Sequence, residues 1–263
     1  MTRHNELRSI TLDLESARQQ GKWRKLAEHG QSLLLIPDLP DEARSLARGA
    51  TSDGYFRWDD EEELRSLHYD DLLVPLQGDI PSTIDPADQY WLRGLLQEKR
   101  LSYQRRGDWR QIVKDLSTAI ELSSMRSEYF FWRASVYGFH GSDYSRALLD
   151  CRKAIELDPA KATYFAGQGA IYIAAAATNH PLGDMDKGIA DISHAIQLEP
   201  TWASLYWMRA QIYRTQEHDD KAIVDERNLC DIDPLLAARF FATRAKENQF
   251  HYEKAIHLWF AHF

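Results

Sequence analysis

The chain has 263 residues and a formal net charge of −8, and 44% of its residues are hydrophobic and 11% aromatic. This composition is typical of a globular protein and excludes a disordered or low-complexity chain. The excess of acids argues against a nucleic-acid partner, because such binding depends on Lys and Arg neutralising phosphates. It favours a protein partner, and a basic one in particular.

Cysteine usage and the amino-terminal sequence bear on the cellular compartment of the protein. Only Cys151 and Cys230 occur, without CxxC spacing, so neither a disulfide framework nor a zinc cluster is indicated and reduced thiols are expected. Residues 1–20 have no apolar core of the length that a secretory signal needs. No run of about 20 apolar residues indicates a membrane helix. The sequence predicts a cytoplasmic protein without membrane contact.

Residues 1–86 contain helical spacing of apolar residues that predicts two helix pairs. The first covers residues 7–38 and turns at Gly21 to Trp23. The second covers residues 41–77, and its turn stays open because TSDGYFRWDDEEE at 51–63 offers two breaks.

An acidic run, WDDEEELRSLHYDDLL at residues 58–73, lies within the second pair. It is either a solvated helix face or a docking surface for a basic partner, whose electrostatic steering salt would weaken. The candidate docking residues are Asp59, Asp60, Glu61, Glu62, Glu63, Asp70 and Asp71.

Residues 87–234 contain a repeated sequence motif. SRALLDCRKAIELDP (145–159), DKGIADISHAIQLEP (186–200) and DKAIVDERNLCDIDP (220–234) place an aspartate, an apolar pair and a proline at matching positions. Each copy of the motif follows a polar turn and, before it, a segment whose apolar residues have helical spacing. The motif itself ends at its proline, because proline cannot continue a helix. The repeat is therefore a pair of helices. The aspartates, at steps of 35, 41 and 34 residues, are Asp115, Asp150, Asp191 and Asp225.

This pattern resembles the tetratricopeptide repeat family, whose unit of about 34 residues places a large residue, a small residue, Tyr, Ala and Pro at set positions. The best match, residues 203–234, has Tyr206, Ala210, Tyr213, Ala222 and Pro234 at these positions. The other matching units are 93–124, 127–159 and 162–200, the last with an insertion around ATNHPLG.

The resemblance implies an all-α fold, a right-handed α-solenoid of antiparallel helix pairs. In this division, residues 1–86 are degenerate amino-terminal pairs, 87–234 hold the four recognisable repeats, and 235–263 are a carboxy-terminal pair. A helix pair cannot bury its apolar face alone, so stacked neighbours form a continuous core.

Basic residues recur upstream of the repeated aspartates. An acid and a base present once per repeat can pair between neighbouring helices and satisfy both charges. Catalysis would need one distinct site rather than the same acid and base in every repeat. We therefore predict that Arg133 and Arg209 lie within hydrogen-bonding reach of these aspartates. The recurring bases are Lys99, Arg133, Arg209 and Arg244.

Motifs for catalysis or cofactors are not found. GxxxxGK[ST], GxGxxG and GxSxG are absent, and the histidines lack the one-turn spacing of a zinc-binding helix. The sequence therefore predicts no catalytic residue, no metal and no cofactor. The histidines concerned are His180, His194, His251, His257 and His262.

In the resembled family, partners are held in a concave groove lined by the first helix of each pair. The family's carboxylate clamp is not found here, so an extended or helical apolar peptide is the expected ligand. The alternative is that the groove aromatics pack against adjacent helices. The groove positions carried over are Gln97, Leu101, Gln104, Phe131, Ser135, Phe139, Ala166, Ala170, Ile173, Trp207, Gln211 and Arg214.

Two segments leave alternatives open. The insertion at residues 177–183 is either a contact loop or a tolerated bulge. The terminal AIHLWFAHF lacks the polar outer face that terminal repeats need. It either folds back on the preceding pair, forms a homodimer surface, or precedes a capping helix that this chain lacks.

The sequence thus predicts a noncatalytic scaffold or adaptor that binds a peptide or protein in its concave groove. One alternative is a dedicated inhibitor of the immunity type, which sequesters a single basic partner protein. A third hypothesis is an enzyme with its site on the helices of the second predicted pair, residues 41–77. A repeat fold alone does not decide among them.

Overall fold

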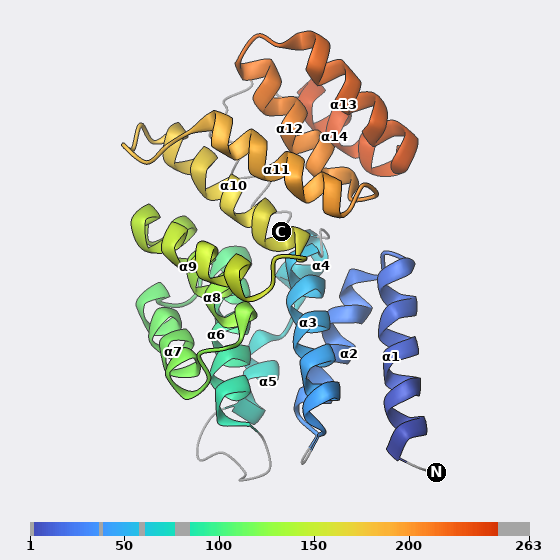
Figure 1. The fold of residues 1–263 in the computed structure, drawn as a ribbon, viewed down its shortest axis with the longest axis vertical. Coiled ribbons are helices and arrows are strands. Elements are labelled where there is room, and N and C mark those ends of the chain that lie inside the picture. Colours follow the sequence, from blue (N-terminus) through green and yellow to red (C-terminus); the bar gives the residue numbers. More distant parts are fainter. Residues whose placement is uncertain (1–2, 37–38, 58–60, 77–84, 247–263) are drawn as a thin grey trace. The chain divides into compact units, whose positions relative to one another are not determined.

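The structure is a computed structural model that describes residues 3–36, 39–57, 61–76 and 85–246. These residues form helices joined by turns and loops and contain no strand, so the all-α prediction is confirmed (Figure 1). The chain divides between Arg133 and Ala134 into two compact units, and each is described by itself.

The first unit is built from helix pairs joined by short turns. Helices α2 and α3 pack along one another, α1 lies against both, and α6 packs against α7 and against the short helices before it. The elements are α1 (Arg3–Gln19), α2 (Trp23–Leu34), α3 (Asp41–Arg57), α4 (Glu61–Ser66), α5 (Tyr69–Leu73), the 3-10 turn η1 (Val74–Leu76), α6 (Pro86–Gln104), α7 (Trp109–Leu122) and α8 (Ser127–Ser135).

The second half of the predicted 41–77 pair is broken. Helix α4 ends at Ser66 and α5 starts at Tyr69, with His68 in a non-helical conformation (φ −83°, ψ 72°). Leu64 and Tyr69 are both buried although they are five positions apart, whereas neighbours on one face of a helix are three or four positions apart. The break between α4 and α5 is compatible with the burial of both side chains.

The second unit continues the repeat. Helix α10 packs against α9 and α11, α11 packs against α12, and α14 packs against α13. The elements are the π-helical turn η2 (Val136–His140), α9 (Tyr144–Leu157), α10 (Ala162–Ala177), α11 (Met185–Leu198), α12 (Ala203–Thr215), α13 (Asp219–Ile232) and α14 (Pro234–Lys246). The remainder of the predicted carboxy-terminal pair lies outside the described residues.

The repeated prolines end the second helices. Helices α9, α11 and α13 stop two residues before Pro159, Pro200 and Pro234 respectively. Proline lacks the amide donor that a continuing helix needs, and its ring restricts the preceding residue to extended conformations. The helix ends predicted from the sequence are confirmed.

Aspartates begin three of the second helices. The side chains of Asp108, Asp143 and Asp184 accept hydrogen bonds from the backbone N–H groups of Arg110, Arg146 and Lys187, at 3.0, 3.1 and 3.0 Å. Each bond satisfies one amide that has no partner within its own helix. The turn inside each of these pairs is therefore specified locally.

Small residues dominate the core at the start of the second unit. Ala147, Cys151 and Ala175 are completely buried in one cluster with Tyr144 and Ile171. Burial raises the pKa of the Cys151 thiol, because the thiolate would lose its hydration. Cys151 and Cys230 are both free.

Candidate functional site

The best-matching repeat contains the predicted acid–base pair. Arg209 of α12 donates through Nε and Nη2 to the Asp225 carboxylate of α13, at 2.8 and 2.7 Å. Its Nη1 also donates to Ser193 Oγ of α11 at 2.8 Å. Burial opposes the charge of Arg209, but the bonds to Asp225 outweigh it and raise the pKa of the guanidinium. The prediction for Arg209 is confirmed.

A second pair links α6 to α7 through Arg93, which is not among the recurring bases. Arg93 donates through Nε and Nη2 to Asp115 at 2.8 and 2.6 Å, and these bonds raise the pKa of Arg93. The pairing of Lys99 with an aspartate stays a prediction. The buried Lys99 ammonium lies 5.0 Å from the Trp132 ring centroid, and its pKa is lowered by burial.

The other predicted bases are only partly described. Arg133 donates through Nη1 to Ser117 Oγ at 3.0 Å, which repeats the Arg209–Ser193 contact at the same separation of 16 residues. Its pairing with an aspartate stays a prediction. The side chain of Arg244 lies outside the described residues.

Asp191 is the exception among the repeated aspartates. Its Oδ2 atom is buried without a hydrogen-bond partner, and burial raises the pKa of this carboxyl to about 7. Gln168 occupies the place on α10 that Arg209 occupies on α12, six residues after the helix start. The pair α10/α11 therefore lacks the arginine that neutralises the aspartate of α12/α13.

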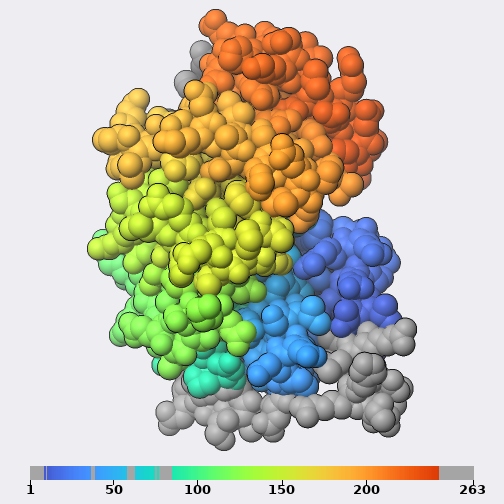
Figure 2. Space-filling view, viewed as in Figure 1, coloured from blue at the N-terminus to red at the C-terminus, as the bar shows by residue number. Residues whose placement is uncertain are grey.

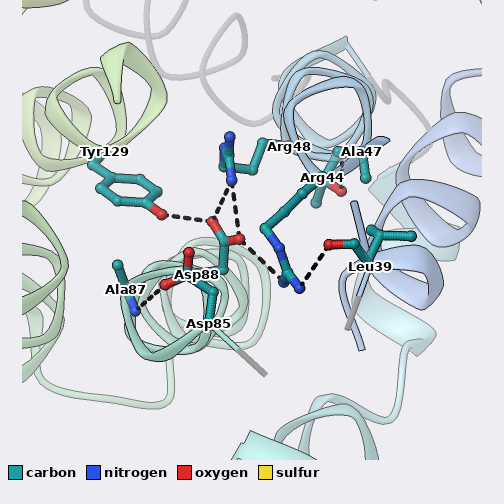
Figure 3. A network of polar contacts seen from close by, with 9 residues as sticks. Leu39, Arg44, Ala47, Arg48, Asp85, Ala87, Asp88 and Tyr129 are labelled. Atoms are coloured by element: carbon teal, nitrogen blue, oxygen red, sulfur yellow. Dashed lines mark hydrogen bonds and ion pairs between the residues drawn. The ribbon is translucent and has the colours of Figure 1, made fainter. Parts of the chain in front are cut away.

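A buried polar network joins α3, α6 and α8 in the first unit (Figure 3). Arg48 donates through Nη1 to both carboxylate oxygens of Asp88, at 3.1 and 3.0 Å, and Tyr129 donates its hydroxyl to the same carboxylate at 2.5 Å. Arg44 lies 3.6 Å from Asp88 and donates to the Leu39 carbonyl. Burial raises the pKa of Tyr129.

This network acts structurally. Arg48, Asp88 and Tyr129 are all buried, so a substrate in solution does not reach them. The two arginines offset the carboxylate charge, which would otherwise be costly to bury. The network, which includes Arg44 and Arg48 of the predicted 41–77 pair, therefore offers no accessible acid or base to an enzyme built on the helices of that pair.

The predicted groove residues are at least partly covered. Half-buried positions are Gln97, Leu101, Gln104, Phe139, Trp207 and Arg214. Buried positions are Phe131, Ser135, Ala166, Ala170, Ile173 and Gln211.

Several groove residues have partners inside their own unit. Trp207 stacks on Phe240 of α14 with ring centroids 5.0 Å apart. Gln104 donates to the carbonyls of Arg65 and Leu67, at 3.0 and 2.9 Å. Arg214 donates to the Glu226 carboxylate of α13. These contacts favour internal packing for Trp207, Gln104 and Arg214.

Phe131 also packs internally. Its ring meets Phe56 of α3 edge to face at 4.9 Å. For this residue, too, the contact favours packing against a neighbouring helix.

The acidic run is partly neutralised by the chain's own arginines. Glu63 accepts a hydrogen bond from Arg24, and Asp70 accepts one from Arg100 at 2.6 Å. Asp71 is exposed. Asp59 and Asp60 lie outside the described residues, as do the side chains of Glu61 and Glu62.

The remaining titratable groups form no metal centre within the part of the chain that the structure describes: it brings together no three His, Cys, Asp or Glu residues that could hold an ion. His180 lies against the Tyr144 ring and His194 against the Phe165 ring, with centroids 5.1 and 4.2 Å apart. None of the described helices has the length and apolar character to cross a membrane.

Comparisons with known proteins return structures only. No family model matches the chain, and no curated protein matches it. A crystal structure of MamA matches with a TM-score of 0.48 and 16% identity, over 76% of this chain and 98% of that chain. MamA from Desulfovibrio magneticus RS-1, from residue 41 to its end, gives 0.46 and 15%, over 73% and 96%.

A third similar structure is YrrB, described as a TPR protein with an unusual peptide-binding site. It matches with a TM-score of 0.46 and 16% identity, over 77% of this chain and 92% of that chain. Likeness at this level adds nothing on function. The chain's own helix pairs, which end at prolines and recur at the predicted steps, give it the fold of a tetratricopeptide-like helical repeat protein.

Proposed function

We propose that this chain is a noncatalytic protein-binding scaffold that holds a peptide along the first helices of its pairs. The observation that carries the proposal is a pair of half-buried, chemically different side chains one helical turn apart on the first helix of one pair. This pair, the accessible floor, is Gln97 and Leu101 on α6.

The chemistry of the accessible floor suits an apolar peptide. Leu101 offers apolar area, while the Gln97 amide makes no hydrogen bond within the described residues. A free amide can donate to a peptide carbonyl and accept from a peptide N–H group. Backbone recognition of this kind, combined with apolar contacts, is a common mode of peptide binding.

The pairing of three buried or partly buried arginines with aspartates supports a noncatalytic role. Arg93 with Asp115, and Arg209 with Asp225, pair across the two helices of one repeat, and Arg48 pairs with Asp88 inside the first unit. Acids and bases held in this way fix helix positions and are not free to transfer protons to a bound substrate.

The test is capture of partners from a lysate of the native source, at low and at high salt, with a matched pair of variants. Leu101→Lys places a charge on the accessible floor. Leu122→Lys places the same charge on α7, where the side chain is already 55% exposed. We expect Leu101→Lys to reduce partner recovery by about tenfold and Leu122→Lys to leave it unchanged.

Equal recovery by both variants, with circular dichroism showing that both are folded, would contradict binding on the floor. The salt series separates the remaining alternative. One stoichiometric basic protein released at high salt would favour a dedicated inhibitor, because screening weakens attraction between exposed charges. Several proteins that share a short apolar segment would favour the scaffold.

A further inference from the structure

The insertion at residues 177–183 is a defined loop that folds back onto α10. His180 N donates to the Ala175 carbonyl at 2.9 Å, and Asp184 N donates to the Tyr172 carbonyl at 3.3 Å. A Cβ atom on Gly183 would lie 2.3 Å from Ala176 Cα, so the loop backbone touches the helix directly. Several main-chain contacts thus fix the position of the loop.

This loop forms one wall of a cleft of about 390 Å³, whose other walls come from α9, the end of α10 and the start of α11. Figure 2 shows the yellow-orange segment that contains the loop at the surface of the molecule. Leu149 of α9 and Leu182 of the loop both line the cleft and are 58% and 40% exposed. Two large apolar side chains are therefore presented to solvent in one concave site.

The cleft is also locally basic. Arg152 of α9 lines it and makes no hydrogen bond or ion pair within the described residues. Lys187 lies 3.0 Å from Asp184, the carboxylate that caps α11, and 5.6 Å from the Tyr172 ring centroid. Two cations and one carboxylate line the cleft, in a chain whose net charge is −8. An exposed arginine beside apolar area matches a carboxylate next to an apolar side chain.

We propose that this cleft binds an acidic segment of a partner protein, an extended peptide in which an apolar side chain neighbours an aspartate or glutamate. The apolar side chain lies between Leu149 and Leu182, and the carboxylate pairs with Arg152. The inference rests on the proposed function and deepens it, because it adds a contact site that the first-helix floor does not include.

The probe is an array of ten-residue peptides with acetylated and amidated ends, each carrying one Leu or Phe beside Asp, Asn or Lys in a Gly/Ser background. Blocked ends remove the terminal carboxylate, so only a side chain can supply the acid. Affinities of the best peptides are then measured by fluorescence anisotropy. We expect the Asp peptides to bind at least about tenfold more tightly than their Asn counterparts.

Two variants and a matched control test the assignment. Arg152→Glu and Leu182→Ser should each weaken binding of the Asp peptides by about tenfold. The control is Arg227→Glu. Arg227 is exposed like Arg152, and it occupies the equivalent position in its repeat: each arginine lies two residues after the repeated aspartate of its helix. This control should change affinity by less than about twofold.

Equal affinity for Asp and Asn peptides, equal effects of Arg152→Glu and Arg227→Glu, or no binding at millimolar peptide would each overturn the proposal. The floor variant Leu101→Lys separates this outcome from failure of the proposed function. If Leu101→Lys loses lysate partners but still binds the array peptides, both proposals hold. If it loses neither while Arg152→Glu loses the peptides, only the proposal for the floor fails.

Discussion

The helix pairs α10/α11 and α12/α13 make the same contact in two different ways. In α12/α13, Arg209 and Asp225 form a two-bond ion pair across the helices. In α10/α11, the equivalent aspartate has no arginine, and the backbones approach closely instead. A Cβ atom on Gly169 would lie only 2.9 Å from the Gly188 carbonyl oxygen. The two pairs therefore join their helices by different chemistry.

The difference also shows what each solution costs. Glycines allow the helices to meet but weaken each helix, since glycine is about 1 kcal/mol less favourable than alanine in a helix interior. An arginine–aspartate pair keeps both helices regular but requires two charges to leave water. Three substitutions would break or sharpen this contrast.

The largest effect is expected for Gly169→Val. Three added carbon atoms would meet the Gly188 carbonyl oxygen and Ile192 Cγ1, which would lie 2.9 and 3.2 Å from a Cβ atom at this position. Overpacking of this kind should lower the free energy of unfolding by about 2–4 kcal/mol. Urea denaturation followed by circular dichroism measures it.

The control for this prediction is Ala190→Val, on the exposed face of α11. It also adds a β-branched side chain to a helix and should cost about 0.5 kcal/mol. A similar loss in the two variants would mean that close approach of α10 and α11 contributes little.

The next effect is expected for Arg209→Met. Removing the guanidinium leaves Asp225, whose side chain is 3% exposed, buried without its counter-charge. The expected loss is about 2–3 kcal/mol in the free energy of unfolding. Gln168→Met, at the equivalent place on α10, should cost less than about 1 kcal/mol. Equal losses would show that the ion pair is not what distinguishes the two helix pairs.

The smallest effect is expected for Asp191→Asn, and it depends on pH. The folded chain raises the pKa of Asp191 from 3.8 to about 7, so it holds this proton more tightly than the unfolded chain does. The free energy of unfolding of the wild type should therefore fall as pH rises from 4 to 7, and Asn should remove this part of the slope.

Asp191 is only partly buried, so the expected effect is modest. Between pH 4 and pH 8, the free energy of unfolding of the wild type should fall by about 1 kcal/mol more than that of Asp191→Asn. Parallel stability profiles across this range would contradict an unpaired, poorly hydrated carboxyl.

Local patterns allowed much of the fold to be predicted. The prolines that end α9, α11 and α13 act on their own helices, so their effect does not depend on distant residues. The Arg209–Asp225 pair was predictable because both residues recur at repeat spacing. The repeat gives each the same place on its helix.

Contacts without a repeat could not be predicted. Arg48, Asp88 and Tyr129 come from three helices, and each is about 40 residues from the next. No spacing rule joins them. Likewise, Arg93 lies outside the repeat register, and its contact with Asp115 follows from how α6 sits on α7. The cleft depends on how an insertion without a counterpart folds back, which the sequence left open.

The aspartates that begin α7, α9 and α11 have a consequence for synthesis of the chain. Each bond spans two or three residues, so it needs no residue from a later part of the chain to form. A helix pair of about 34 residues takes roughly 2–7 s to be translated, whereas helices and short turns form within microseconds. The two helices of each pair can thus pack together before the next pair emerges. The apolar face of a pair is then exposed only until the following pair has been synthesised.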